Sequence, residues 1–143
     1  MLDEAKKLFN DTDIVLVHDG NRPLVSADII SNSISICQQK GCAIAAIPCH
    51  DALLYSEDKF EACKQISRDL VVRTQTPHTF YLKDLYDMHM EAKQKGINNS
   101  IASCTLAIEL GKKVYFSLGS EKNIKITVLD DLDIFKALLN VRF

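Results

Sequence analysis

Residues 13–17 (DIVLV) form a short apolar run, and they lead directly into residues 18–23 (HDGNRP), where turn-forming and charged residues accumulate. A short run rich in β-branched residues is typical of a strand buried in a sheet, and the residues after it are typical of a loop. Sheets of α/β proteins bind their ligands beyond the carboxyl ends of the strands. The chain therefore predicts a buried strand that presents a polar loop at a binding edge.

Strand-like and helix-like segments alternate along the rest of the chain. A second strand is expected over 42–47, directly after a helix over 27–40 that begins at the N-cap Ser26 and ends at Gly41. The remaining expected elements are a helix over 82–95, a helix over 101–110, a strand over 114–118, a strand over 123–127 and a helix from Asp130 to Leu139. This alternation predicts an α/β fold, a Rossmann-like three-layer sandwich with a largely parallel sheet.

The alternating pattern loosens between Pro48 and Arg73. Two short β-like pieces, 52–55 and 70–73, flank the charged stretch 56–68, which is typical of a hairpin. We expect residues of about 49–73 to project as an arm from a single domain that spans residues 1–143. Thr76-Pro77 follows the arm and predicts a turn.

Composition limits the kinds of partner that this chain can have. Its 143 residues are 47% hydrophobic and 25% charged, as expected of one soluble globular domain. The net charge of −2 provides no basic field for nucleic acid or an anionic membrane. No apolar stretch is long enough to span a membrane. Five cysteines without a C-x-x-C pair argue against a zinc ribbon or a disulfide framework, and we expect a cytoplasmic protein.

Four polar motifs occur in a fixed order along the chain. They are HDGNRP at 18–23, His50-Asp51, Arg68 with QTP at 75–77, and Gly119-Ser120 with NIKIT at 123–127. In this order they resemble the cytidylyltransferase family that makes CDP-methylerythritol and CDP-ribitol, which carries HD-x-x-RP, a D-T pair before an arm, Q-T-P-Q and N-I-K-[IVL]-T. The similarity runs from about Ile14 to the carboxyl terminus.

The resemblance implies magnesium-dependent transfer of CMP from CTP to a sugar-alcohol phosphate, with release of pyrophosphate. The implied acceptor is 2-C-methyl-D-erythritol 4-phosphate, an intermediate of isoprenoid biosynthesis, or D-ribitol 5-phosphate. Such a reaction brings two polyanions together while charge builds on the transferring group, so fixed cations and a metal ion are needed.

The first motif supplies two candidate site residues. Asp19, at the carboxyl end of a strand, is suited to orient magnesium or nucleotide hydroxyls; the alternative is an aspartate that caps a turn. Arg22 could clamp the acceptor phosphate with its planar guanidinium; the alternative is a surface arginine beside a turn proline. The family pattern favours the site role for both.

Three further candidates come from the later motifs. Lys125 lies within an expected strand, where a buried cation needs an anionic partner, and the family places this lysine at the phosphates as a catalytic residue; a strand face open to water is the alternative. Thr76 could donate a hydrogen bond to a phosphate oxygen or simply form a Thr-Pro turn. In the family, the arginine that matches Arg68 reaches the acceptor site of the neighbouring subunit, which implies a homodimer; the alternative is a solvated charge.

Residues 1–143 depart from the family pattern in three places. The family's glycine-rich A-A-G-x-G-x-R-M loop, whose backbone N–H groups approach the nucleotide phosphates, has no counterpart before Ile14, and the match is that of an N-terminally truncated domain. Ala52 stands where the family has threonine, and residues 101–103 (IAS) stand where many members have T-D-E or S-D-A. We therefore expect the lone chain to transfer little or no CMP.

Other functions fit parts of this pattern. One alternative is a non-catalytic module that retains acceptor-phosphate binding and dimerisation. Another is an ordinary α/β binding domain whose motif matches are accidental. The His18-Asp19 and His50-Asp51 pairs also suggest a metal-dependent phosphohydrolase, but the further ligands that such a site requires are missing from the pattern. In every case we expect self-association, through the arm or through an unpaired strand edge.

Overall fold

The computed structural model describes residues 2–140 and contains a four-stranded sheet in the order β1-β5-β2-β6. The strands are β1 (Ile14–Val17), β2 (Cys42–Pro48), β5 (Val72–Tyr81) and β6 (Phe116–Leu118). β5 pairs antiparallel with both β1 and β2, whereas β2 and β6 pair in parallel. β1, β2 and β6 therefore run in one direction and end at the same edge. The predicted α/β class is confirmed, but the sheet is mixed and not largely parallel, because β5 pairs antiparallel with both of its neighbours.

The prediction of a turn at Thr76-Pro77 is wrong, because both residues lie inside β5. The pairing of β2 with β5 shifts its register between Ile44 and Ala46, opposite the segment 75–77, and the Thr76-Pro77 peptide bond is cis. Proline cannot donate a ladder hydrogen bond, so a strand accepts it only where the pairing is irregular. The register shift therefore allows β5 to continue through Thr76-Pro77, a sequence that local preferences predict to be a turn.

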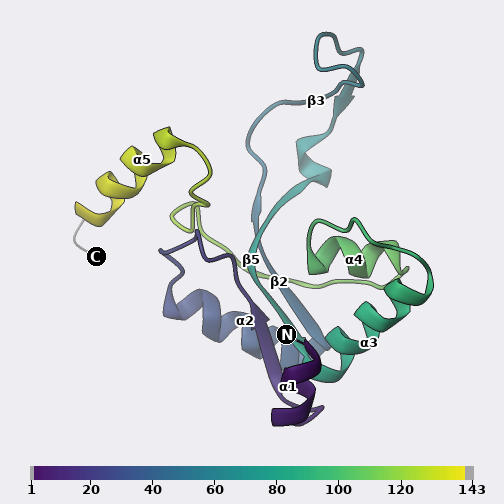
Figure 1. The fold of residues 1–143 in the computed structure, drawn as a ribbon. Helices are drawn as coiled ribbons and strands as arrows, with labels where there is room; N and C mark the ends of the chain where they lie inside the picture. Colours follow the sequence, from purple (N-terminus) through teal and green to yellow (C-terminus); the bar gives the residue numbers. More distant parts are fainter. Residues whose placement is uncertain (1, 141–143) are drawn as a thin grey trace.

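Helices cover both faces of the sheet and give the three predicted layers (Figure 1). On one face, α2 (Ala27–Lys40) begins with the Ser26 cap and ends at Gly41, as predicted, and its Ser33 hydroxyl bonds the hydroxyl of Thr79 on β5. On the other face, α3 (Leu82–Gln94) and α4 (Ser103–Glu109) pack on the strands. The core there comprises Cys42, Ile44, Phe80, Leu85, Met88, Cys104 and Ala107. A short helix, α1 (Leu2–Leu8), packs against α3.

The arm is a separate two-stranded hairpin that extends away from the sheet (Figure 1). It consists of β3 (Leu53–Tyr55) and β4 (Lys64–Ile66), and the 3-10 turn η1 (Arg68–Leu70) leads from it into β5. The first predicted β-like piece is thus correct, whereas the second, at 70–73, is wrong as a hairpin strand. Its place opposite β3 is taken by β4, and residues 72–73 already belong to the main sheet.

The segment 123–127 (NIKIT) is not the predicted strand. It follows β6 without joining a ladder, and its backbone is instead tied to the loop after β1. The Ile126 N–H donates to the Asn21 carbonyl at 2.9 Å and the Asn21 side chain donates to the Ile126 carbonyl at 2.8 Å. The following helix, α5 (Leu129–Asn140), forms as predicted and stands apart from the sheet (Figure 1). Within residues 2–140, no helix has the length and apolarity needed to cross a membrane.

Candidate active site

The loop after β1, the irregular part of β5 and the segment after β6 meet at one edge of the sheet. There, a cleft of about 670 Å³ is lined by Asp19, Arg22, Thr76 and Lys125. These are four of the five predicted site residues, and they come from three segments far apart in the sequence. The structure therefore brings together the residues that the motifs indicate.

Asp19 holds the two cations of this cluster side by side. Its Oδ2 atom lies 3.2 Å from Nε of Arg22 and 3.2 Å from Nζ of Lys125. Burial alone would raise the pKa of Asp19, but the hydrogen bonds and charges of Lys125 and Arg22 together outweigh it and hold that pKa below its ordinary value. The exposed fractions of the side chains rise from 11% for Arg22 to 44% for Lys125. Arg22 is therefore a fixed part of the wall, and Lys125 reaches toward solvent.

Thr76 and His18 brace the loop that carries Asp19. The Asp19 backbone N–H donates to Oγ1 of Thr76 at 3.0 Å, and Oγ1 lies 3.0 Å from Nδ1 of His18. The other ring nitrogen of His18, Nε2, lies 3.0 Å from the Arg22 carbonyl. Because a carbonyl oxygen only accepts, Nε2 carries the proton in this arrangement, and the Thr76 hydroxyl donates to Nδ1. The Thr76 hydroxyl thus bonds the loop, and the phosphate contact that the sequence predicts for it stays a prediction.

The segment after β6 is joined to the same loop and to β5 by side-chain amides. Arg22 Nη1 donates to the Asn123 carbonyl at 2.7 Å. The Asn123 amide donates to the Thr76 carbonyl at 2.9 Å, and the Gln75 amide donates to the Ser120 carbonyl at 2.8 Å. The sequence alone does not indicate the bracing role of His18, Gln75 or Asn123. The only signal that could have found them is their place inside the same motifs as the predicted residues.

The far part of the cleft is built from α3, α4 and the loop between them. It presents the cationic Lys93, the imidazole of His89 and the polar groups of Asn98, Ser100 and Ser103. Among the cleft-lining residues that the structure describes, Asp19 is the only acid. Because Asp19 already pairs with two cations, the cleft as a whole favours an anionic ligand with hydrogen-bonding groups.

His78 on β5 also lines the cleft but is almost fully buried. Burial lowers the pKa of His78, and the positive charge of Arg22 lowers it further, against the opposing effect of Asp19. His78 stands where the family pattern has its second glutamine. A neutral imidazole therefore takes the place of a neutral amide in this wall.

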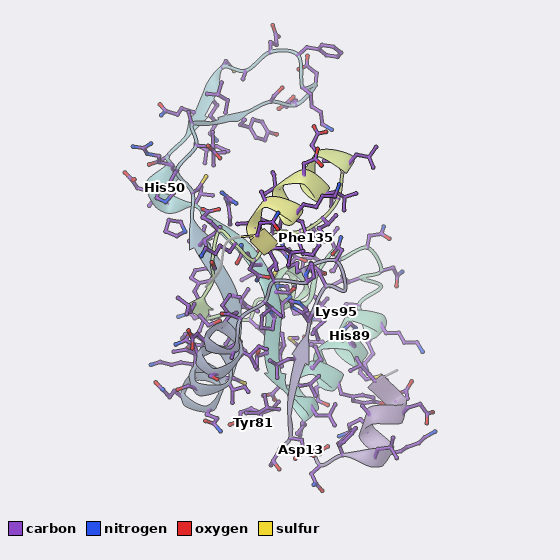
Figure 2. All side chains as sticks on the ribbon, turned by 90° about the vertical axis from the view of Figure 1, so that its left-hand side faces the viewer. Asp13, His50, Tyr81, His89, Lys95 and Phe135 are labelled. Carbon is purple, nitrogen blue, oxygen red and sulfur yellow. The ribbon has the colours of Figure 1, made fainter. Side chains whose placement is uncertain are left out.

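Arg68, the fifth predicted residue, is not part of the cleft. It begins η1 and its Nη1 atom donates to the His50 carbonyl at 3.1 Å. Figure 2 shows His50 near the arm, well away from His89 at α3. Arg68 therefore closes the base of the arm within this chain, and its predicted contact with a substrate bound to a second copy stays a prediction.

Solved structures similar in fold are cytidylyltransferases. The 2-C-methyl-D-erythritol 4-phosphate cytidylyltransferase of Thermus thermophilus superposes with a TM-score of 0.79 at 31% identity, over 90% of this chain and 62% of that one. The corresponding protein of Francisella tularensis gives a TM-score of 0.85 at 24% identity, over 95% and 63% of the two chains, and supports the fold alone. The chain therefore shares the fold of these nucleotidyltransferases over most of its length, and its cleft lies at the strand-end edge of that fold.

A profile of one family matches almost the whole chain. Residues 3–141 match the 2-C-methyl-D-erythritol 4-phosphate cytidylyltransferase family, and the chain belongs to it. A ribitol-5-phosphate cytidylyltransferase of Lacticaseibacillus paracasei is 37% identical over 131 residues, which are 90% of this chain and 56% of that protein. A 2-C-methyl-D-erythritol 4-phosphate cytidylyltransferase of Alkaliphilus oremlandii is 37% identical over 140 residues, or 96% and 58%. The chain thus spans less than two thirds of the length of these relatives.

Proposed function

We propose that this chain acts in the transfer of CMP from CTP to a sugar-alcohol phosphate. An oxygen of the acceptor phosphate attacks the α-phosphorus of CTP, a new P–O bond forms, and the bond to pyrophosphate breaks. The observation that carries this proposal is the position of Asp19, which holds Arg22 and Lys125 together on the wall of a cleft. Two cations at one point are suited to bind a dianionic phosphate.

Each residue of the cluster has a role in this proposal. Arg22, nearly buried and fixed by Asp19, binds the acceptor phosphate through its guanidinium. Lys125, the more exposed of the two cations, neutralises charge on the transferring phosphoryl group. Asp19 keeps both cations in place. Thr76 holds the Asp19 loop, and its hydroxyl reaches a phosphate oxygen only by exchanging its bond to His18.

Magnesium is the metal that this reaction is expected to use. Within residues 2–140 no group of three or more acidic, histidine or cysteine side chains could hold a metal ion. The chemistry of the donor set still fits, because magnesium is commonly bound by one or two carboxylates together with substrate phosphates. Asp19 is that carboxylate here, and its Oδ1 atom makes no hydrogen bond to a described residue. When bound, magnesium would supply positive charge beside the triphosphate.

The proposed acceptor is a short polyhydroxyl chain with a phosphate at one end. The relatives above are named for D-ribitol 5-phosphate or 2-C-methyl-D-erythritol 4-phosphate, and both have this form. With the phosphate at Arg22, the hydroxyl groups would meet the amide and hydroxyl side chains of Asn98, Ser100 and Ser103.

The five cysteines of the chain are unpaired thiols, which supports the prediction of a cytoplasmic protein.

We also propose a homodimer in which the arm contacts a second copy. The arm exposes large apolar side chains, with Leu54 at 65%, Phe60 at 95% and Leu70 at 88%. Apolar surface of this kind usually marks an interface. Arg68, at the base of the arm, would then lie near the partner's cleft.

Calorimetry with the purified chain tests the acceptor site. D-ribitol 5-phosphate or 2-C-methyl-D-erythritol 4-phosphate should bind, and Arg22→Ala and Lys125→Ala should each weaken binding about tenfold or more, because each removes a charge-assisted hydrogen bond worth about 1.5–3 kcal/mol. Lys136→Ala, which removes an exposed lysine of α5 that pairs with Asp133, is the matched control and should bind normally. Failure of the unaltered chain to bind either acceptor would reject the proposed function.

A further inference from the structure

Two buried side-chain amides meet behind the cluster of cations. Asn123 is fully buried, and Gln75 is 5% exposed. The Asn123 amide nitrogen lies 3.4 Å from Oε1 of Gln75 and 2.9 Å from the Thr76 carbonyl. Burying an amide is costly unless it is hydrogen-bonded, so this pair is held by a defined set of partners.

Gln75 fixes the segment after β6 onto the irregular part of β5. Its Nε2 atom donates to the Ser120 carbonyl at 2.8 Å, and its Oε1 atom accepts from the Ser120 N–H at 3.1 Å. The two bonds reproduce the pattern that a neighbouring strand would make with Ser120. One side chain therefore supplies the pairing that the segment lacks, since its residues join no ladder.

Asn123 links the segment after β6 to Arg22. Its backbone carbonyl accepts the 2.7 Å hydrogen bond from Nη1 of Arg22, while Asp19 accepts from Nε of the same guanidinium. The plane of the guanidinium is thus fixed from two sides. Lys125 follows Asn123 by two residues, so the same segment also sets where the second cation leaves the backbone.

In the side-chain amide of Asn123, the nitrogen makes hydrogen bonds and the oxygen does not. Its Oδ1 atom is buried and has no hydrogen-bond partner among residues 2–140, whereas its nitrogen has two. An unpaired buried acceptor destabilises the folded state. An apolar side chain at position 123 would avoid that cost, so packing alone does not explain the asparagine. The hydrogen bonds that its amide nitrogen donates are the feature that requires this residue.

We propose that Asn123, braced by Gln75, is a positioning residue that orients Arg22 and Lys125 toward a single phosphate. Asn123 does not line the cleft and does not touch the ligand. It acts through its hydrogen bonds to Thr76 and Arg22. The inference rests on the proposed function, because the phosphate that the two cations would bind is that of the acceptor.

A double-mutant cycle on acceptor binding tests this inference in the full chain. Asn123→Ala should weaken D-ribitol 5-phosphate binding about tenfold when Arg22 is present, and less than about twofold in an Arg22→Lys background, because lysine lacks the Nη1 donor. A loss of equal size in both backgrounds would mean that Asn123 supports the fold without acting through Arg22, and it would overturn the inference. Gln75→Met, which removes the hydrogen bonds to Ser120 without adding a charge, provides a second variant and should behave like Asn123→Ala.

A measurement without ligand separates this inference from the proposed function. The Nε–H resonance of Arg22, identified by its loss in Arg22→Lys, should shift or broaden in Asn123→Ala and in Gln75→Met. An unchanged resonance in both variants would overturn the positioning role, whether or not any acceptor binds. Failure of the unaltered chain to bind an acceptor, with the resonance shifted as expected, would reject the proposed function and leave the positioning of Arg22 supported.

Discussion

Asp19 and Lys125 form an ion pair of 3.2 Å that joins the loop after β1 to the segment after β6. The same oxygen of Asp19 also binds Arg22. One carboxylate thus gathers the two cations that the sequence motifs place at opposite ends of the chain. The charge of this carboxylate is therefore the first property to test.

Asp19→Asn should reduce stability at neutral pH and remove part of its acid dependence. The pKa of Asp19 is lowered in the folded protein, so its stabilising contribution is present above the ordinary pKa of aspartate and is lost as the pH falls through the lowered value. Urea unfolding between pH 3 and 7 should show the two proteins converging toward low pH. A constant difference between them would contradict the ion-pair assignment.

His78→Gln should make the protein less sensitive to mild acid. The pKa of His78 is lowered by burial, so the folded state binds fewer protons than the unfolded state, and stability falls as the pH drops below about 6.5. Glutamine has no charge to gain. Thermal unfolding at pH 7.5 and pH 5.5 should therefore show a smaller loss in the variant, and His89→Gln, at an exposed site on α3, should retain the loss seen with the natural sequence.

Gly119→Ala should destabilise the segment that carries Lys125. A Cβ atom at Gly119 would lie 2.6 Å from the Ala46 carbonyl oxygen and 2.8 Å from Cγ2 of Ile47, so the backbone would have to shift, at a cost of about 1–3 kcal/mol. Gly20→Ala is the matched control, because a Cβ atom there meets nothing within 4 Å. Equal unfolding midpoints for the two variants would show that the segment adapts freely.

The purified 143-residue polypeptide should bind the acceptor and transfer CMP only slowly, if at all. Its five glycines stand singly at positions 20, 41, 96, 111 and 119, and a loop that approaches a triphosphate needs clustered glycines. Calorimetry should therefore detect acceptor binding and little CTP binding. Rapid formation of a CDP-polyol from CTP, magnesium and the chain would refute this expectation.

Self-association should depend on the arm. Phe60→Ser and Leu70→Ser replace the two most exposed apolar side chains of the hairpin region, and both should shift sedimentation at micromolar concentration toward monomer. Leu139→Ser on α5, 57% exposed, tests whether any apolar loss has this effect and should leave the arm contact intact. Sedimentation of the unaltered chain as a monomer alone at this concentration would exclude the proposed homodimer.

Elements with a complete local signal could be predicted from the sequence, and elements that depend on a distant partner could not. The helix 27–40 is flanked by its N-cap Ser26 and its terminating Gly41, and the structure reproduces both boundaries. Neither β4 nor the full length of β5 is predictable in this way, because a charged hairpin strand and a strand through Pro77 contradict local preferences. The NIKIT pattern alternates like a strand, but within residues 2–140 this segment joins no ladder.

Local patterns in the chain were enough to predict the α/β class, because strand, cap and loop preferences act between near neighbours. The four residues of the cluster were predicted from the resemblance of the ordered motifs to one family. The three-dimensional fold was needed to show that Asp19 binds both cations, that the Thr76 hydroxyl accepts from the Asp19 N–H, and that the Asn123 carbonyl accepts from Arg22. Those contacts join residues 57 and 101 positions apart, as in Asp19 with Thr76 and Arg22 with Asn123. Their geometry exists only once the sheet has brought its strand ends to one edge.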